Sequence, residues 1–322
     1  MIIVTGGAGF IGSNIVRALN ERGEDDILIV DNLGKGDKYK NLVGLKFFDY
    51  MHRDDFIGAL LSGIFNSADI DVIFHEGACS DTMNYDVNYM IQTNYEYSKA
   101  LFNFCAENEI EFIYASSAST YGGGANGFRE VEPCEDALNP YAFSKLIFDR
   151  YVRQNLDDAD NKVVGLRYFN VFGPQEFHKG RMASIAYQMY SQIKNSGVIK
   201  LFKGTDGYED GEQRRDFIYV KDVAAVNLWC WDNELDSGIY NCGTGHATSF
   251  NAVAQAVIDA LGTGRIEYID FPAELNGKYQ SFTQADTKKL LRAGYDGGFT
   301  PIKKAVREYC NFLDGGGYYK LN

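Results

Sequence analysis

The 322-residue sequence lacks several features, and each absence excludes a class of protein. No apolar run approaches the ~20 residues that a membrane-spanning helix requires, and no leader precedes the first apolar stretch. No basic cluster occurs and the net charge is −13, so nucleic acid and anionic membranes are poor partners. An anionic substrate would therefore have to be bound by a few local Lys and Arg side chains.

Disulfide and metal-binding patterns are missing as well. The six cysteines are scattered without CxxC spacing, at positions 79, 105, 134, 230, 242 and 310, which is typical of free thiols in a reducing compartment. The four histidines are equally dispersed, so no metal-ligand spacing exists. With 45% hydrophobic and 23% charged residues and no clean linker, we expect a metal-free cytoplasmic protein of one large or two interleaved domains.

The first 31 residues carry the strongest positive pattern. An apolar run at 1–4, helical spacing at 13–22 and a second apolar run at 27–30 predict a strand, a helix and a strand, and the second strand ends on Asp31. The stretch TGGAGFIG at 5–12 separates the first strand from the helix. This arrangement is typical of a dinucleotide-binding unit.

The glycines of this stretch have separate tasks in such a unit. Gly6 would permit the tight turn, Gly9 would let the backbone approach a pyrophosphate, and Gly12 would let the helix pack against the strand. The phosphates would then meet the free N–H groups at the positive end of the helix.

The residues around Asp31 leave the choice of dinucleotide open. An acid at this place ordinarily accepts hydrogen bonds from the ribose hydroxyls, which favours NAD. Lys35 and Lys38 follow in a polar loop, where they would either neutralise a 2′-phosphate, which favours NADP, or remain solvated loop charges.

Strands and helices continue to alternate after Asp31. We expect strands at 45–50, 71–75, 111–115 and 160–167, helices at 54–62, 85–108 and from 139 onward, and a turn at 170–174. This order predicts a doubly wound parallel α/β sheet of the Rossmann type over 1–170, and a smaller substrate domain mainly over 171–322. Ligands of such sheets lie outside the carboxyl ends of the strands, so the small residues at 76–80 would let a cofactor lie close.

Tyr141 and Lys145 are four residues apart and therefore share one face of the predicted helix. A cation beside a phenol lowers the pKa of the phenol, and the phenolate can then take the proton of a substrate alcohol as hydride leaves the carbon. Ser117, which follows the strand at 111–115, can hold the same oxygen. The three residues predict hydride-transfer chemistry at a carbinol carbon.

With these motifs the sequence resembles the extended short-chain dehydrogenases/reductases, the group of nucleotide-sugar epimerases and dehydratases. The resemblance runs nearly end to end, through TGGAGFIG at 5–12, SSASTYG at 116–122, YAFSK at 141–145, RYFNVFGP at 167–174, RRDFIYVKDVA at 214–224 and NCGTG at 241–245. Within the group it is similar to the ADP-L-glycero-D-manno-heptose 6-epimerases, through FHEGACS at 74–80, HKGRMAS at 178–184 and KYQSFTQAD at 278–286.

The resemblance implies a set of site residues. Those expected to bind the cofactor are Gly6, Gly9, Phe10, Ile11, Gly12, Asp31, Asn32, Lys38, Arg53, Glu76, Gly77, Ala78, Cys79, Ser80, Asn94, Lys145, Val171 and Lys179. Those expected to bind the substrate are Ser117, Asn170, Arg181, Gln188, Phe202, Lys203, Gly204, Thr205, Arg215 and Tyr279. The expected catalytic residues are Ser117, Tyr141, Lys145 and Lys179.

The resemblance also implies an activity. The enzyme would invert C6″ of ADP-D-glycero-D-manno-heptose to give ADP-L-glycero-D-manno-heptose, a step in making lipopolysaccharide inner core, by transient oxidation and re-reduction with bound NADP. Both faces of the ketone must meet one fixed nicotinamide, so the sugar has to turn in the site and a second acid/base is expected on its far side. Lys179 matches the lysine that the group has at this place. The alternative interpretation of Lys179 is a contact to a substrate phosphate. The resemblance further suggests that the chain forms a homo-oligomer, such as a pentamer.

Two alternatives remain open at this point. The chain could be another nucleotide-sugar epimerase or a dehydratase, although a dehydratase normally needs an acid pair beside the serine and Ala118 and Ser119 do not supply one. It could also be a non-catalytic NADP-binding protein, because a fold does not determine a function. The intact Ser117, Tyr141 and Lys145 argue against the second alternative.

Overall fold

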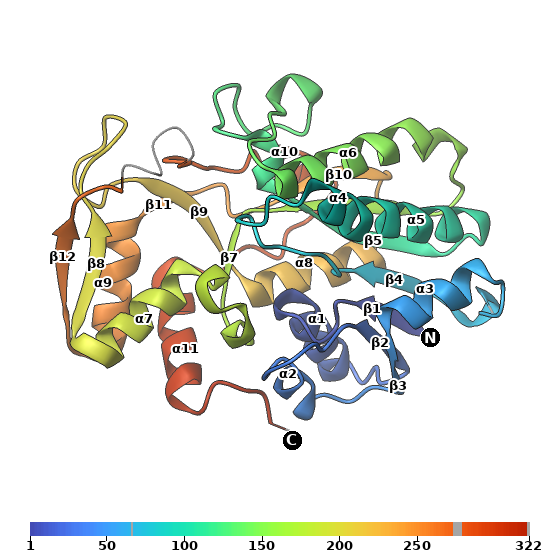
Figure 1. Cartoon of the computed structure of the whole chain (residues 1–322), viewed down its shortest axis with the longest axis horizontal. Helices are drawn as coiled ribbons and strands as arrows, with labels where there is room; N and C mark the ends of the chain where they lie inside the picture. Colours follow the sequence, from blue (N-terminus) through green and yellow to red (C-terminus); the bar gives the residue numbers. More distant parts are fainter. Residues whose placement is uncertain (66, 273–278, 321–322) are drawn as a thin grey trace.

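A sheet of seven parallel strands forms the centre of the molecule, in the order β10-β6-β5-β4-β1-β2-β3 (Figure 1). The structure is a computed structural model and describes residues 1–65, 67–272 and 279–320. The chain leaves β1 in one direction through β2 and β3 and returns on the other side through β4, so a ligand crevice opens between β1 and β4. The predicted doubly wound α/β fold is confirmed. The strands are β1 (Ile2–Thr5), β2 (Ile27–Asp31), β3 (Asp49–His52), β4 (Val72–His75), β5 (Glu111–Ser117), β6 (Val163–Tyr168) and β10 (Gly238–Cys242).

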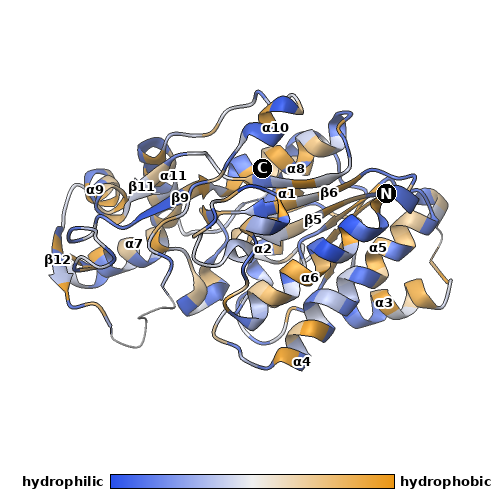
Figure 2. Cartoon of the chain, turned by 90° about the horizontal axis from the view of Figure 1, so that it is seen from above, coloured by the Kyte–Doolittle hydropathy of each residue, from blue (hydrophilic) through white to orange (hydrophobic). Residues whose placement is uncertain are grey.

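Helices cover both faces of this sheet, as the burial of successive strand residues on opposite sides requires (Figure 2). Ile2 and Val4 of β1 belong to the core under α1 (Phe10–Glu21) and α8 (Val220–Asp232). Ile3 belongs to the opposite core, which α3 (Arg53–Leu61), α5 (Tyr97–Glu107) and α6 (Pro140–Asn155) cover. None of the helices in the described part of the chain is both long and apolar enough to cross a bilayer.

The later segments build a second, smaller core beside the sheet (Figure 1). Its apolar side chains come mainly from three helices, α7 (Ile185–Ser196), α9 (Phe250–Leu261) and α11 (Ile302–Asp314). Two small sheets accompany them: β7 (Asn170–Phe172), β9 (Arg214–Tyr219) and β11 (Ala247–Ser249) in one, and β8 (Val198–Phe202) with β12 (Arg265–Ile269) in the other. α8 and β10 return to the first core, and the domain division at residue 170 stays a prediction.

Two local predictions were wrong, and one strand was missed. The third strand begins at Asp49 rather than at residue 45, because Leu45 is buried as an anchor against the core while Phe48 is 74% exposed, and the ladder with β2 starts only at Asp49. The predicted turn at 170–174 contains β7, which pairs with the distant β9. β10 was not predicted, since its pairing with β6 is equally remote in sequence.

Candidate active site

A cavity of about 430 Å³ lies at the carboxyl ends of β1, β2, β4 and β5, where the crevice was expected. We call it the cofactor cavity. Lys35 does not line it, and neither does Asn94. Every other residue predicted to bind the cofactor lines this cavity: Gly6, Gly9, Phe10, Ile11, Gly12, Asp31, Asn32, Lys38, Arg53, Glu76, Gly77, Ala78, Cys79, Ser80, Lys145, Val171 and Lys179.

The glycine turn between β1 and α1 fits a pyrophosphate. Gly6 has φ +66°, and a Cβ there would lie 2.7 Å from the carbonyl carbon of Glu76, so only glycine keeps this turn against the loop after β4. A Cβ on Gly12 would lie 2.3 Å from the carbonyl oxygen of Gly6. Helix α1 begins after Gly9 with no side-chain cap and no acidic residue in its first turn, so its first N–H groups remain available at the cavity wall.

The carboxylate of Asp31 is held by several donors at the end of β2. It accepts the backbone N–H of Ala8 at 2.9 Å through Oδ2, and the backbone N–H of Asn32 at 2.6 Å through Oδ1. Lys38 donates its ammonium to the same Oδ1 at 2.5 Å. The negative charge of Asp31 is therefore balanced by a lysine that itself lines the cavity.

Asn94 supports the cavity wall from behind. It lies in a π-helical stretch (Ile91–Glu96) between α4 (Val87–Met90) and α5, within the single helix predicted at 85–108. Its Oδ1 accepts the N–H of Cys79 at 2.8 Å, and its Nδ2 donates to the carbonyl of Cys79 at 2.9 Å and to the hydroxyl of Ser144 at 3.0 Å. The side chain thus joins the loop after β4 to helix α6.

Ser117, Tyr141 and Lys145 all line the cofactor cavity. Ser117 ends β5, and Tyr141 and Lys145 lie in the first turns of α6, which Asn139 caps through a hydrogen bond from the N–H of Ala142 at 2.9 Å. Lys145 donates its ammonium to the carbonyl of Ala115 at 2.7 Å, and burial lowers the pKa of Lys145 to about 8.

The sequence argument about the phenol was wrong in direction. Burial raises the pKa of Tyr141, although a hydrogen bond with the Ser117 hydroxyl opposes this, and Lys145 does not act on that phenol here. The main cause is the burial of the phenol, and the Lys145 ammonium donates its hydrogen bond to the Ala115 carbonyl. The raised pKa favours the protonated phenol.

Glu76 is an ionisable group whose raised pKa the sequence argument missed. It follows β4, lines the cavity and accepts the hydroxyl of Tyr168 at 2.7 Å. Burial raises the pKa of Glu76 to about 7, against the opposing effects of Tyr168 and Lys145. An acid directly after a buried strand, among small residues, was the available signal.

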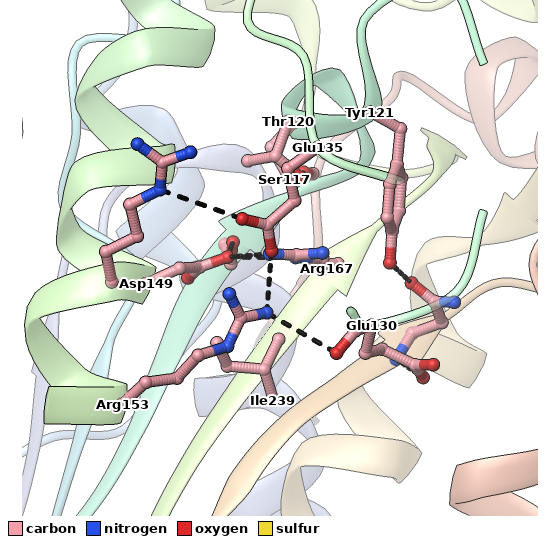
Figure 3. A network of polar contacts seen from close by, with 12 residues as sticks. Ser117, Thr120, Tyr121, Glu130, Glu135, Asp149, Arg153, Arg167 and Ile239 are labelled. Atoms are coloured by element: carbon pink, nitrogen blue, oxygen red, sulfur yellow. Dashed lines mark hydrogen bonds and ion pairs between the residues drawn. The ribbon is translucent and has the colours of Figure 1, made fainter. Parts of the chain in front are cut away.

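A buried ionic network fixes α6 against the sheet (Figure 3). Asp149 lies two turns after Tyr141 on α6 and accepts the Ser116 hydroxyl of β5 at 2.8 Å and Nε of Arg167 of β6 at 2.9 Å. Arg167 also pairs with Glu135 at 2.5 Å, and all three charged side chains are fully buried. The network holds the helix that carries Tyr141 beside the strand that carries Ser117.

A second cavity of about 680 Å³ opens beside the first, and we call it the substrate cavity. Of the residues predicted to bind substrate, those that line it are Asn170, Gln188, Phe202, Arg215 and Tyr279. The guanidinium of Arg215 lies 5.1 Å from the centre of the Tyr279 ring, and its Nε is buried without a hydrogen-bond partner among the described residues. A buried guanidinium with a free donor, next to an aromatic ring, suits an anionic ligand that also carries a ring.

Four residues predicted to bind substrate lie outside both cavities. Arg181 is largely exposed and pairs with Asp81 at 3.1 Å, and Lys203 pairs with Asp270 at 2.7 Å. Gly204 and Thr205 follow Lys203 where the chain leaves β8. Both cations thus form surface ion pairs and do not line either cavity.

Lys179 stands where the cavities meet, and both are lined also by Ser80, Tyr141, Phe169 and Val171. Lys179 lies in a 3₁₀ segment (Phe177–Met182), and its ammonium is 5.4 Å from the centre of the Phe10 ring. Burial lowers the pKa of Lys179, opposed by the charge of Glu176. The described residues 1–65, 67–272 and 279–320 contain no group of three or more His, Cys, Asp or Glu that could hold a metal ion.

Known proteins share this architecture. The model of the NAD dependent epimerase/dehydratase family matches residues 2–243. The chain is similar to the ADP-L-glycero-D-manno-heptose-6-epimerase of Helicobacter pylori, with 30% identity over 97% of this chain and 96% of that chain and a TM-score of 0.83. It is similar to a UDP-N-acetylglucosamine 4-epimerase from Methanobrevibacter ruminantium (28% identity, 98% of each chain, TM-score 0.84). A UDP-glucose 4-epimerase of Thermus thermophilus, solved with NAD, shares 26% identity over 98% of this chain and 99% of that chain (TM-score 0.77). The chain therefore belongs to the NAD dependent epimerase/dehydratase family.

Proposed function

We propose that this protein is a nucleotide-sugar epimerase that inverts one carbinol carbon by oxidation and re-reduction. The observation that carries the proposal is the position of two proton-transfer groups, Tyr141 and Lys179, at the junction of the cofactor and substrate cavities. A bound nicotinamide dinucleotide would accept and return the hydride. The glycine turn, with its uncapped helix N-terminus, suits the pyrophosphate of that group.

The two groups divide the proton chemistry. Burial favours the neutral amine of Lys179, which accepts the proton of the substrate alcohol, and the protonated phenol of Tyr141, which donates a proton to the ketone oxygen. In the reverse reaction Tyr141 becomes the base and Lys179 the acid. Ser117 holds the oxygen near Tyr141, so inversion needs no single group to reach both faces.

The proposed dinucleotide is NADP. Lys38 lines the cofactor cavity and already balances the charge of Asp31, so a 2′-phosphate would meet a cation there instead of an isolated carboxylate. Asp31 keeps an oxygen near the remaining ribose hydroxyl. NAD is the alternative, since the Thermus thermophilus relative was solved with NAD.

The proposed substrate is ADP-D-glycero-D-manno-heptose, with ADP-L-glycero-D-manno-heptose as product. Support comes from the similarity to the Helicobacter pylori enzyme. It comes also from the stretches 74–80 and 178–184, which resemble the ADP-L-glycero-D-manno-heptose 6-epimerases and contribute residues to the walls of both cavities. The third such stretch, 278–286, begins at a residue outside the described ones. A cytoplasmic homo-oligomer acting in lipopolysaccharide inner core synthesis is part of the proposal.

The test is to incubate the protein with ADP-D-glycero-D-manno-heptose, UDP-glucose and UDP-N-acetylglucosamine separately. Proton NMR would follow C6″ of the heptose and C4″ of the hexoses. We expect inversion of the heptose alone. Inversion of a UDP-sugar instead would refute the heptose as substrate and keep epimerisation, and no inversion in any reaction would contradict the proposed activity.

A further inference from the structure

A pair of amide side chains fastens the segment before Lys179 to the glycine turn. Asn41 of α2 (Lys40–Val43) is 1% exposed, and its Nδ2 donates to the carbonyl oxygens of Ala8 and Gln175, both at 3.0 Å. In return, Nε2 of Gln175 donates to the backbone carbonyl oxygen of Asn41 at 3.0 Å. We call the reciprocal pair the Asn41–Gln175 clasp. Nδ1 of His178 lies 3.2 Å from the same Nδ2.

The clasp holds a strained backbone. Gln175 has φ +77°, a left-handed conformation that residues other than glycine rarely adopt, and its side chain is fully buried. Such strain persists only where the surroundings over-determine the conformation, and it tends to occur at functional sites. The reciprocal hydrogen bonds to Asn41 provide that constraint.

The strained residue lies two positions before the segment Phe177–Met182, which carries Lys179. The residue between them, Glu176, is fixed in the second core, where its carboxylate accepts the hydroxyls of Ser184 at 2.7 Å and Tyr309 at 2.9 Å. The N–H of Lys179 donates to the carbonyl of Glu176 at 3.0 Å. The clasp on the cofactor turn and the anchor in the second core therefore both fasten the chain directly before the segment that carries Lys179.

We propose that Asn41 is a positioning residue that, through Gln175, holds Lys179 at the junction of the two cavities and in register with the glycine turn. The inference rests on the proposed role of Lys179 as second acid/base. Proton transfer requires donor and acceptor atoms within about 3 Å, so a small shift of this segment would separate Lys179 from the substrate oxygen. Neither side chain of the clasp lines the cavities, so Asn41 acts on the reaction through the backbone that it holds and through its contact with His178, which lines the cofactor cavity.

The first test is Asn41→Ala. It removes the donors to Ala8 and Gln175, and we expect kcat to fall about 10²-fold, the usual scale for a misplaced group, while KM for the nucleotide sugar changes little. The matched control is Asn20→Ala, because Asn20 makes three hydrogen bonds of similar length, to Glu24 and Lys46, far from both cavities. The control should lose comparable thermal stability and keep kcat.

A second variant separates positioning from folding. Gln175→Gly keeps the backbone carbonyl that Asn41 binds and tolerates the positive φ, but it removes the buried side chain together with the bond from Nε2. We expect a folded protein, because the relief of backbone strain offsets part of the lost packing, with a kcat loss smaller than that of Asn41→Ala. A wild-type kcat in both variants would overturn the inference.

Two further readouts bear on Lys179 itself. The first is a single-turnover measurement of nicotinamide absorbance in Asn41→Ala. The epimer that Lys179 deprotonates should reduce the cofactor more slowly than in the wild type, and the other epimer should reduce it at the wild-type rate. Acylation of Lys179, followed by peptide mapping across pH without substrate, should show its pKa moving up toward the ordinary lysine range in Asn41→Ala, because burial is what lowers it. An unchanged Lys179 profile would contradict the positioning role.

Lys179→Met distinguishes the two levels of the argument. If that variant loses turnover and Asn41→Ala does not, the clasp is wrong and the proposed function stands. If Lys179→Met keeps its turnover, the role of Lys179 fails first, and the acylation profile alone still decides whether Asn41 positions that side chain.

Discussion

The two cavities that meet at Tyr141 and Lys179 are built in different ways. The cofactor cavity is walled by residues that directly follow strands: the glycine turn after β1, Asp31 at the end of β2, and the loop after β4. The substrate cavity is walled by side chains of α7, β8 and β9, segments that come together only in the folded chain. The shape of the first therefore follows from the sheet, whereas that of the second depends on individual side chains.

Their electrostatics differ in part. At the cofactor cavity Asp31 is already paired with Lys38, and Lys145 is bonded to the Ala115 carbonyl. Each cavity also has one arginine, Arg53 at the first and Arg215 at the second, whose Nε is buried without a hydrogen-bond partner among the described residues. The cofactor cavity is built for a dinucleotide, and the specificity of the substrate cavity depends on a few side chains. Substitutions at the junction and on either side of it test this difference.

The largest effect is expected at the junction, at Tyr141, which lines both cavities. Tyr141→Phe keeps the ring and removes the proposed proton donor, so kcat should fall about 10²–10⁴-fold in steady-state assays while the bound dinucleotide is retained. A folded variant with near-normal turnover would remove Tyr141 from the chemistry.

Lys179→Met is expected to have the next largest effect, and it sharpens the comparison because Lys179 belongs to both cavities. If Lys179 is an acid/base, kcat should fall about 10²-fold or more in both directions, with substrate binding nearly normal by calorimetry. A raised KM with kcat preserved would instead make Lys179 a phosphate contact, an interaction made equally with substrate and transition state.

A change confined to the cofactor cavity is expected to have a smaller effect. Lys38→Met removes the cation proposed to meet the 2′-phosphate, and a charge-assisted hydrogen bond of about 1.5–3 kcal/mol corresponds to at least about tenfold weaker NADP binding. NAD binding should be unchanged or tighter, because the Asp31 carboxylate is released. Calorimetry on nucleotide-stripped protein measures both, and Lys35→Met, in the same loop but off the cavity, is the control. Equal loss for NAD and NADP would argue against the phosphate contact.

The smallest effect is a pH dependence of stability from Glu76. Its folded pKa, about 7, lies above its ordinary value of 4.5, so the folded state binds more protons between these values. Stability therefore falls as pH rises through this window, and the full penalty is present above it. Glu76→Gln should flatten this part of the thermal-stability profile and raise the melting temperature above pH 7. A profile identical to that of the wild type would show that Glu76 ionises normally.

The sequence predicts these two regions unequally for a physical reason. The cofactor wall is local: strand, glycine turn, helix and acid are adjacent in the chain, so periodicity and glycine spacing indicate Gly6, Gly12 and Asp31 directly. Arg181 and Lys203 were predicted to bind substrate by resemblance alone, and in the structure both lie outside the cavities in surface ion pairs with Asp81 and Asp270, which no local pattern encodes.

Long-range pairing accounts for the remaining misses. β7 and β10 are short strands whose partners, β9 and β6, are remote in sequence, and neither shows the alternation of an independent strand. The raised pKa of Tyr141 was also beyond the sequence, because it depends on burial rather than on helical spacing.

The most direct test of the central claim is to run the epimerisation in deuterium oxide and examine C6″ of both epimers by NMR at equilibrium. If the hydrogen that leaves the carbon returns to its opposite face without exchanging with solvent, the two epimers reach their equilibrium ratio and neither carries deuterium at C6″. Deuterium at C6″ would mean that the carbon exchanges its hydrogen with solvent, and would contradict inversion by oxidation and re-reduction.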